Sequence, residues 1–333
     1  MSERPIEPSE VRFFSGSSNQ ELAAGIADYL KVPLDPTRKR RFSNDNLYIQ
    51  LGGSVRSREV FIVQSLSPPV NDHLMELLMM LDISRGAGAK EIHAIIPYFS
   101  FGRSDKKDAP RISITARLVA DLLATAGATQ VMTMMLHSPQ VHGFFSLPTD
   151  PLSSRPVFQQ YFQAMDLEGT IVVVPDLGHV KSASRFAEAL NLPLAAAIKH
   201  RISDTEVKIS GIMGDQCHDC HTALIYDDEI ATGGSMVELI QHLVDDGIRR
   251  VFAVCTHGVF VRQALERLSQ IPEVQEIVTT DTVAIEDPAR FPKLRRLSVA
   301  HIFGEAIRRN FNRQSIGDLF VYGTDGDEDQ SFT

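Results

Sequence analysis

Residues 221–236 have the sequence HTALIYDDEIATGGSM, which carries the clearest indication of the fold of this chain. The apolar run 223–226 is typical of a buried strand and leads directly into two adjacent acids. The loop 231–235 follows, and from about Met236 apolar residues recur at helical spacing. The stretch therefore predicts a strand, a short loop and a helix, which is the repeating unit of an α/β sheet.

The loop 231–235 has the composition of a phosphate-binding site. Its glycines let the backbone curl around a phosphate, and the amides at a helix N-terminus point toward the bound charge. Thr232 and Ser235 can donate from their hydroxyls, while Asp227 and Asp228 can accept from sugar hydroxyls, directly or through Mg²⁺. A plain strand-to-helix turn with a serine cap is the alternative. The acid pair before the loop favours a sugar phosphate.

Composition limits the remaining function classes. The chain has 333 residues, enough for two domains, and it contains no apolar run of about 18 residues, so we expect no membrane span. The formal net charge of −9 disfavours nucleic acid as a partner. Three cysteines argue against a disulfide scaffold, and the polar N-terminus lacks the character of a signal peptide. We therefore expect a cytoplasmic protein.

Strand and helix patterns alternate through both halves of the chain. The order IVQS, LMELLMML and GAKEIHAIIP in the first half is echoed by LIYDD, MVELIQHL and GIRRVFAVCT in the second. We therefore predict an α/β protein with two copies of one unit, each a mostly parallel sheet flanked by helices. The expected parts are domains at 1–153 and 154–301, a C-terminal segment at 302–320 and a flexible acidic tail at 321–333.

The stretch YDDEIATGGS resembles the phosphoribosyl-diphosphate loop of type I phosphoribosyltransferases and of ribose-phosphate diphosphokinases, the PRPP synthetases. The rest of the chain favours the second family, because it contains, in order, FFSGSSNQELA, RFSNDNLYIQ, SVRSREVFIVQS, PPVNDHLMELLMMLD, RSDKKDAPRISITARLVADLL, HSPQVHGFF and AVCTHGVF. The resemblance covers nearly the whole of residues 11–320. It implies two tandem phosphoribosyltransferase-like domains, with 302–320 packed on the first of them.

The resemblance also implies an activity and its substrates. The family transfers the diphosphoryl group of ATP to the anomeric hydroxyl of ribose 5-phosphate, which gives PRPP and AMP. Its members form dimers that stack into hexamers, so we expect a homo-oligomer. The implied cofactor is Mg²⁺, with Mn²⁺ as a second candidate because an imidazole ligand is softer than an oxygen ligand.

Roles for individual residues follow from the same resemblance. The ATP side comprises Phe42, Asn44, Arg103, Ser104, Asp105, Lys106 and His137. The ribose-phosphate side comprises Asp176, Asp227, Asp228, Ala231, Thr232, Gly233, Gly234 and Ser235. The implied catalytic residues, which would stabilise charge on the transferring group, are Lys199 and Arg201. The candidate metal ligands are His137, Asp176 and Asp150, and the residues that match a phosphate-responsive regulatory site are Ser54 and Arg56.

Four positions have lost an acid that the family usually carries, namely Asn46, Met135, Ser146 and Ala231. Fewer oxygen ligands weaken a protein site for Mg²⁺, so we expect the metal to enter with ATP. The losses leave open a non-catalytic regulatory relative and a diphosphokinase with an altered pentose-phosphate preference. A base phosphoribosyltransferase is a further alternative, but such an enzyme needs no ATP site. The retained cation pair at 199 and 201 favours an active diphosphokinase.

Overall fold

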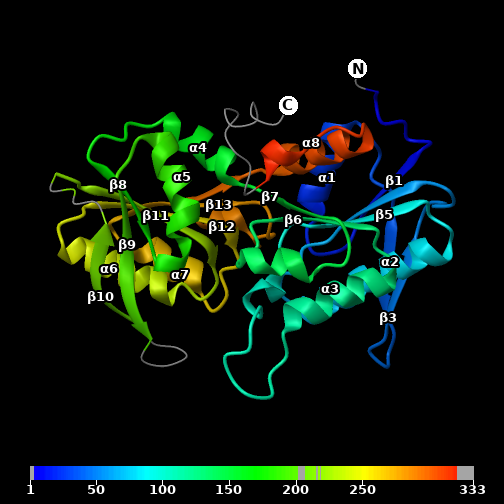
Figure 1. Cartoon of the computed structure of the whole chain (residues 1–333), viewed down its shortest axis with the longest axis horizontal. Coiled ribbons are helices and arrows are strands. Elements are labelled where there is room, and N and C mark those ends of the chain that lie inside the picture. The colour runs from blue at the N-terminus through cyan, green and yellow to red at the C-terminus, as the bar shows by residue number, and fades with distance from the viewer. Residues whose placement is uncertain (1–3, 202–206, 215–216, 218, 321–333) are drawn as a thin grey trace, which may run out of the picture. The chain divides into compact units, whose positions relative to one another are not determined.

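The computed structural model describes residues 4–201, 207–214, 217 and 219–320, with the backbone alone at 199–201 and 207–208. The described chain divides into two compact units, each with a central sheet (Figure 1). Among the described residues, unit 1 contains 4–153, 282–284 and 299–320, and unit 2 contains the described parts of 154–281 together with 285–298. The tail predicted at 321–333 lies outside the described residues.

Unit 1 is built on a parallel sheet with the strand order β1-β4-β5-β6-β7. Its strands are β1 (Val11–Ser15), β4 (Glu59–Val63), β5 (Glu91–Ile96), β6 (Gln130–Met134) and β7 (Thr149–Leu152). Its helices are α1 (Gln20–Leu30), α2 (Val70–Gly86), α3 (Thr115–Ala126) and α8 (Ala300–Phe311), with short 3₁₀ turns η1 (Ser100–Arg103), η2 (Pro139–Phe144) and η5 (Gly317–Leu319). Figure 1 shows α1 and α8 on one face of this sheet and α2 and α3 on the other. Both faces are therefore covered, which explains the nearly continuous apolar runs of the strands.

Helix α8 joins unit 1 although the whole of unit 2 lies between it and β7 in the sequence. Tyr29 of α1 donates a hydrogen bond from its hydroxyl to Oε2 of Glu305 at 2.8 Å. Gly304 lies against the ring of Tyr29, where an added Cβ would come within 2.3 Å of a ring carbon. The absence of a side chain at Gly304 therefore allows α1 and α8 to approach closely.

A separate antiparallel hairpin in unit 1 consists of β2 (Thr37–Arg41) and β3 (Leu47–Leu51). It extends beside α2 and away from the parallel sheet (Figure 1). Apolar alternation predicts only its second strand, because the sequence of β2, TRKRR, contains no apolar residue.

Unit 2 is built on a sheet with the strand order β10-β9-β8-β11-β12-β13-β14, in which only β9 and β10 pair antiparallel among the described strands. Its strands are β8 (Thr170–Val174), β9 (Leu194–Arg201), β10 (Val207–Gly214), β11 (Thr222–Ile230), β12 (Arg250–Gly258), β13 (Val274–Thr280) and β14 (Leu294–Leu297). Its helices are α4 (Arg155–Gln163), α5 (Val180–Leu190), α6 (Gly234–Asp245) and α7 (Ala264–Gln270), with 3₁₀ turns η3 (Leu177–His179) and η4 (Pro288–Arg290). One core layer contains residues of α4 and α5, and the other contains residues of α6 and α7. The predicted α/β fold with mostly parallel, helix-flanked sheets is confirmed.

Two further observations complete the fold. Cys217 and Cys220 form a disulfide across a short turn before β11, with their Cα atoms 5.3 Å apart. This bridge is a local link within one turn and not a scaffold. Among the described helices, none combines the length and apolar character that a bilayer crossing requires.

Candidate active site

The acid pair lies at the carboxyl end of β11, on an edge that β8 leaves open. Strand β11 pairs with β8 only as far as Ile225, whereas its pairing with β12 continues to Ile230. Asp227 and Asp228 lie in this one-sided extension, with side chains 18% and 6% exposed. Both carboxylates therefore lie at the strand end, where ligands of open parallel sheets bind.

The strand predicted at 223–226 is too short, and the helix start predicted near Met236 is too late. Strand β11 continues to Ile230, and α6 begins at Gly234. Ile230 is 2% exposed and belongs to the same core layer as α6, so the chain stays extended past the acids. The acids interrupt the apolar run on which the shorter strand was predicted.

Gly233 makes the turn from the strand into α6. Its φ of +73° is a conformation that glycine adopts without strain. An added Cβ would lie 3.3 Å from the Cβ of Ala264, which is closer than most such contacts. The amides in the first turn of α6 have no partner within the helix, so this end can bind an anion.

Residues that follow β12 donate hydrogen bonds to the backbone of this loop. The amide of Val261 donates to the carbonyl of Ala231 at 3.0 Å, and the Arg267 guanidinium donates to the carbonyl of Thr232. Thr232 is exposed, and Ser235 is half-buried in the first turn of α6. These hydrogen bonds fix the loop backbone, while the Thr232 side chain remains accessible to solvent.

Asp176 brings a third carboxylate into contact with this group. It follows β8, and its Oδ1 accepts from the amide of Gly178 at 2.9 Å, which caps the turn η3. The Nδ1 atom of His179, in the same turn, lies 3.3 Å from Oδ1 of Asp176 and 3.7 Å from Oδ1 of Asp227. Its Nε2 atom lies 3.6 Å from Oδ1 of Asp228. The structure therefore gathers three of the predicted site acids around one imidazole.

His179 was missed in the sequence, where it carried no predicted role. The available signal was its spacing, because it lies three residues after Asp176 in a segment that continues into helix α5. Residues at that spacing are neighbours on a helical turn.

The charges of this cluster shift its titrations strongly. Burial lowers the pKa of His179, but the hydrogen bond to Asp176 and the charges of Asp228 and Asp227 outweigh burial and raise the pKa to about 9. Burial and the charge of Asp228 raise the pKa of Asp227 well above its ordinary value, although the charge of His179 opposes them. Three carboxylates that surround one imidazolium cation are suited to bind a metal cation in its place.

The predicted catalytic pair, Lys199 and Arg201, lies at the end of β9. At 199–201 only the backbone is described. Strand β9 pairs in parallel with β8 up to Ala196, so both positions continue past the end of that pairing, in the direction of Asp176. Lys199 and Arg201 pair in register with Ile209 and Val207 of β10. The hairpin thus extends past the carboxyl end of the sheet. The chain between its strands, 202–206, lies outside the described residues.

Phe42, predicted on the ATP side, follows β2 at the tip of the hairpin. It is 54% exposed, and its ring contacts that of Tyr48 edge-on, with centroids 5.8 Å apart. Asn44 accepts a hydrogen bond through Oδ1 from the amide of Asn46 at 3.3 Å. The tip therefore presents an aromatic face and an ordered turn.

The segment 103–106 lies at the end of η1 and begins the connection to α3, which starts at Thr115. Arg103 and Lys106 are exposed, and Asp105 is half-buried. The carbonyl of Ser104 accepts from the amide of Ala116 at 3.2 Å, which ties this segment to the first turn of α3. Two cationic side chains are thus placed on a fixed turn in unit 1.

The remaining predicted residues also belong to unit 1. His137 is half-buried just after β6, whereas Asp150 is 8% exposed within β7 and accepts a hydrogen bond from the side chain of Gln130. Burial raises the pKa of Asp150. Ser54 and Arg56 are both exposed beyond β3. A metal-binding role for Asp150 would require it to exchange the Gln130 hydrogen bond for the ion.

Comparison with known families and proteins places this site in context. The family model for the N-terminal domain of ribose phosphate pyrophosphokinase matches residues 11–127, and the model for the phosphoribosyl synthetase-associated domain matches residues 208–321. The ribose-phosphate pyrophosphokinase of Deinococcus radiodurans is 44% identical over 318 residues, which cover 94% of this chain and 98% of that protein. The enzyme of the same name from Nostoc sp. PCC 7120 is 41% identical and covers 94% of each chain.

Comparison with solved structures indicates the same family. The crystal structure of phosphoribosylpyrophosphate synthetase from Mycobacterium smegmatis matches with a TM-score of 0.83 at 34% sequence identity, and it covers 91% of this chain and 99% of the other. Identities above 40% over nearly the whole length leave no large part of the chain unmatched. With its acid cluster and glycine loop at one strand end, the chain belongs to the ribose-phosphate pyrophosphokinase family.

Proposed function

We propose that this chain transfers the diphosphoryl group of ATP to the anomeric hydroxyl of ribose 5-phosphate, with the sugar phosphate bound at the end of β11. The proposal rests on the convergence of Asp176, Asp227 and Asp228 beside a glycine loop at the N-terminus of α6. Carboxylates can accept from ribose hydroxyls, while the loop amides and hydroxyls can hold a phosphate. One strand end thus offers both kinds of group that a sugar phosphate needs.

Mg²⁺ is the proposed cofactor, and the donor set fits it. Three carboxylates converge within one cluster, and carboxylate oxygen is the ligand that this hard cation prefers. Asp176 would hold an ion on the sugar side, and His137 would contact the ion that arrives with ATP. Bound there, the ion would neutralise negative charge on the phosphates.

The residues of the chain would act on the reaction as follows. The acid pair holds the ribose hydroxyls and so orients the anomeric oxygen toward the β-phosphorus of ATP. A bond forms between that oxygen and the β-phosphorus while the bond to the oxygen bridging the α-phosphate breaks, so the hydroxyl proton is released and AMP leaves. Lys199 and Arg201 stabilise the charge that spreads over the transferring group. PRPP and AMP are the products.

Removing the two hydroxyls of the loop tests the sugar-phosphate assignment. In a Thr232→Val/Ser235→Ala variant we expect the KM for ribose 5-phosphate to rise about 10- to 100-fold, because hydrogen bonds to a charged group are lost. The KM for ATP should remain within about twofold, because this loop does not bind the nucleotide. Steady-state kinetics with each substrate varied in turn measures both. Ser184→Ala, on α5, is the matched control, and an unchanged KM for ribose 5-phosphate in the double variant would refute the assignment.

We also propose a cytoplasmic homo-oligomer built from dimers, in line with the family to which the chain belongs. Light scattering should then give a particle mass that is a multiple of the chain mass of 36.9 kDa. A particle of one chain mass at the concentration used for activity would contradict this assembly.

A further inference from the structure

The hairpin that carries Phe42 has two strands of opposite character. Lys39 lies opposite Ile49, and Arg41 lies opposite Leu47, so these four side chains share one face of the hairpin. On β3 that face is apolar and packs into the core layer that also contains residues of α2. On β2 the same face carries only cations and a threonine. This face of β2 can therefore be stabilised against the rest of unit 1 by pairing its cations with anionic side chains.

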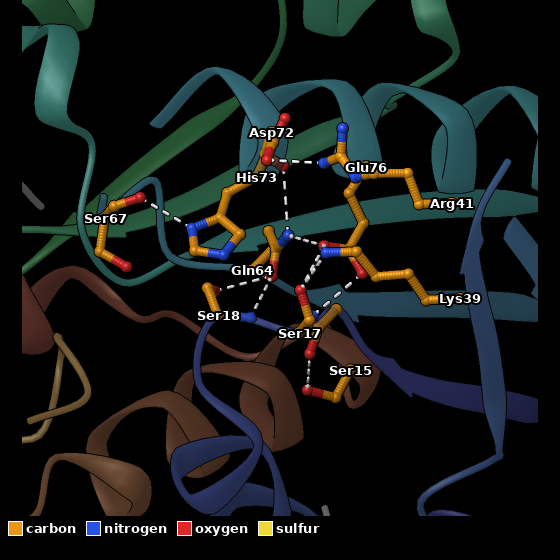
Figure 2. Close-up of polar contacts among 11 residues, drawn as sticks. Ser15, Ser17, Ser18, Lys39, Arg41, Gln64, Ser67, Asp72, His73 and Glu76 are labelled. Carbon is orange, nitrogen blue, oxygen red and sulfur yellow. Dashed lines mark hydrogen bonds and ion pairs between the residues drawn. The ribbon is translucent and has the colours of Figure 1, made fainter. Parts of the chain in front are cut away.

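Helix α2 supplies these anions at matching positions. Lys39 Nζ donates to Oε2 of Glu76 at 2.9 Å, and Arg41 donates to Oδ2 of Asp72 at 2.7 Å (Figure 2). Asp72 and Glu76 are four residues apart, on one face of α2. Lys39 and Arg41 are two residues apart, on one face of β2. Two ion pairs thus fasten the polar strand along the helix.

Glu76 is itself held rigidly. It is 1% exposed, and its carboxylate accepts from the amide and the hydroxyl of Ser17 at 3.1 and 2.6 Å and from Nε2 of Gln64 at 3.0 Å. Gln64 in turn accepts from the amide and hydroxyl of Ser18 at 3.0 and 2.7 Å. Figure 2 shows this network between the loop after β1 and helix α2. The charge of Lys39 compensates a carboxylate that would otherwise be buried without a cation among these partners.

We propose that Lys39 and Glu76 are positioning residues for the nucleotide, because they fix the hairpin that carries Phe42 and Asn44. An isolated two-stranded hairpin is marginally stable in water, so its orientation depends on what anchors each strand. Strand β3 is anchored by apolar packing, and β2 is anchored by the ion pair between Lys39 and the buried Glu76. The inference rests on the proposed function and on the predicted place of Phe42 and Asn44 at its ATP side.

Lys39→Met tests the anchor, because methionine keeps an aliphatic stem and removes the charge. We expect hydrogen exchange of the backbone amides of 37–51 to become about tenfold faster. We also expect the KM for ATP to rise about tenfold, while the KM for ribose 5-phosphate changes less than about twofold. A general loss of stability would instead change the KM values for both substrates to a similar extent.

Two further variants separate positioning from stability. In Lys39→Met/Glu76→Gln the uncompensated carboxylate is gone, so we expect a higher Tm than in Lys39→Met but a KM for ATP that stays raised. Asp82→Asn removes an exposed ion pair with Arg85 at the other end of α2, and it should change neither exchange nor KM. If Lys39→Met does not fold, Asp72→Asn tests the second ion pair, with effects of about threefold.

Unchanged exchange of the hairpin in the folded variant would overturn the inference. So would faster exchange with an unchanged KM for ATP, provided that Phe42→Ala raises that KM. An unchanged KM in Phe42→Ala would instead refute the nucleotide assignment of the proposed function. In that case the exchange rates alone decide whether the pair anchors the hairpin.

Discussion

Lys199→Ala is expected to lower kcat about 10³-fold, the largest single effect that the proposed mechanism predicts. The KM values for ATP and for ribose 5-phosphate should change only a few-fold, because the cation acts on charge that develops in the transition state. Steady-state kinetics with both substrates gives the comparison. The position lies on a hairpin that passes the carboxyl end of the sheet, beside the strand that leads to Asp176.

Lys208→Ala is the matched control for this variant, because Lys208 lies on the paired strand β10, opposite His200. It should leave kcat within about twofold. A normal kcat in Lys199→Ala, or equal losses in both variants, would mean that the pair at 199 and 201 is a solvated turn without a catalytic role.

Asp227→Asn should lower kcat/KM about 10²-fold without lowering thermal stability. Burial and the charge of Asp228 raise the pKa of Asp227 above its value in the unfolded chain. Stability from this group is therefore present below its unfolded pKa, about 4, and is lost as the pH rises. Above that pKa the ionised form is less favourable in the folded protein than in the unfolded chain, so asparagine removes this cost at pH 7.

The stability part is measured as Tm in the presence of EDTA, so that no divalent cation pairs with the acids. We expect the Tm of Asp227→Asn to equal or exceed that of the unchanged protein. Asp246→Asn, at an exposed acid just after α6, should change neither activity nor Tm. A marked fall in Tm with full activity in Asp227→Asn would assign this acid to the fold and not to the site.

The sequence predicted the fold well where burial decides the pattern. Strands buried on both faces, such as β8 and β11, appear as apolar runs, and alternation with helices identifies a parallel sheet. Strand β2 was missed because its inner face meets the carboxylates of α2, and ion pairs leave no apolar periodicity. The end of β11 was missed for a related reason, since Asp227 and Asp228 interrupt the apolar run although the strand continues to Ile230.

The acid cluster was predictable in part. Asp176 and Asp227 each follow an apolar run, and the carboxyl ends of adjacent parallel strands meet at one edge. His179 was not predicted, because nothing in the local sequence shows that its imidazole lies among acids from two strands. The hydrogen bond from Arg267 to the loop could not be predicted from the sequence either, because it depends on how α7 packs beside α6.

Identification of the reaction products is the decisive measurement for the proposed diphosphoryl transfer. The purified protein is incubated with ATP, Mg²⁺ and ribose 5-phosphate, and the products are followed by phosphorus NMR and chromatography. The proposed function predicts that AMP and PRPP appear together in equal amounts and that both depend on the sugar phosphate. Release of ADP in place of AMP, or the absence of any product with every pentose phosphate tried, would contradict it.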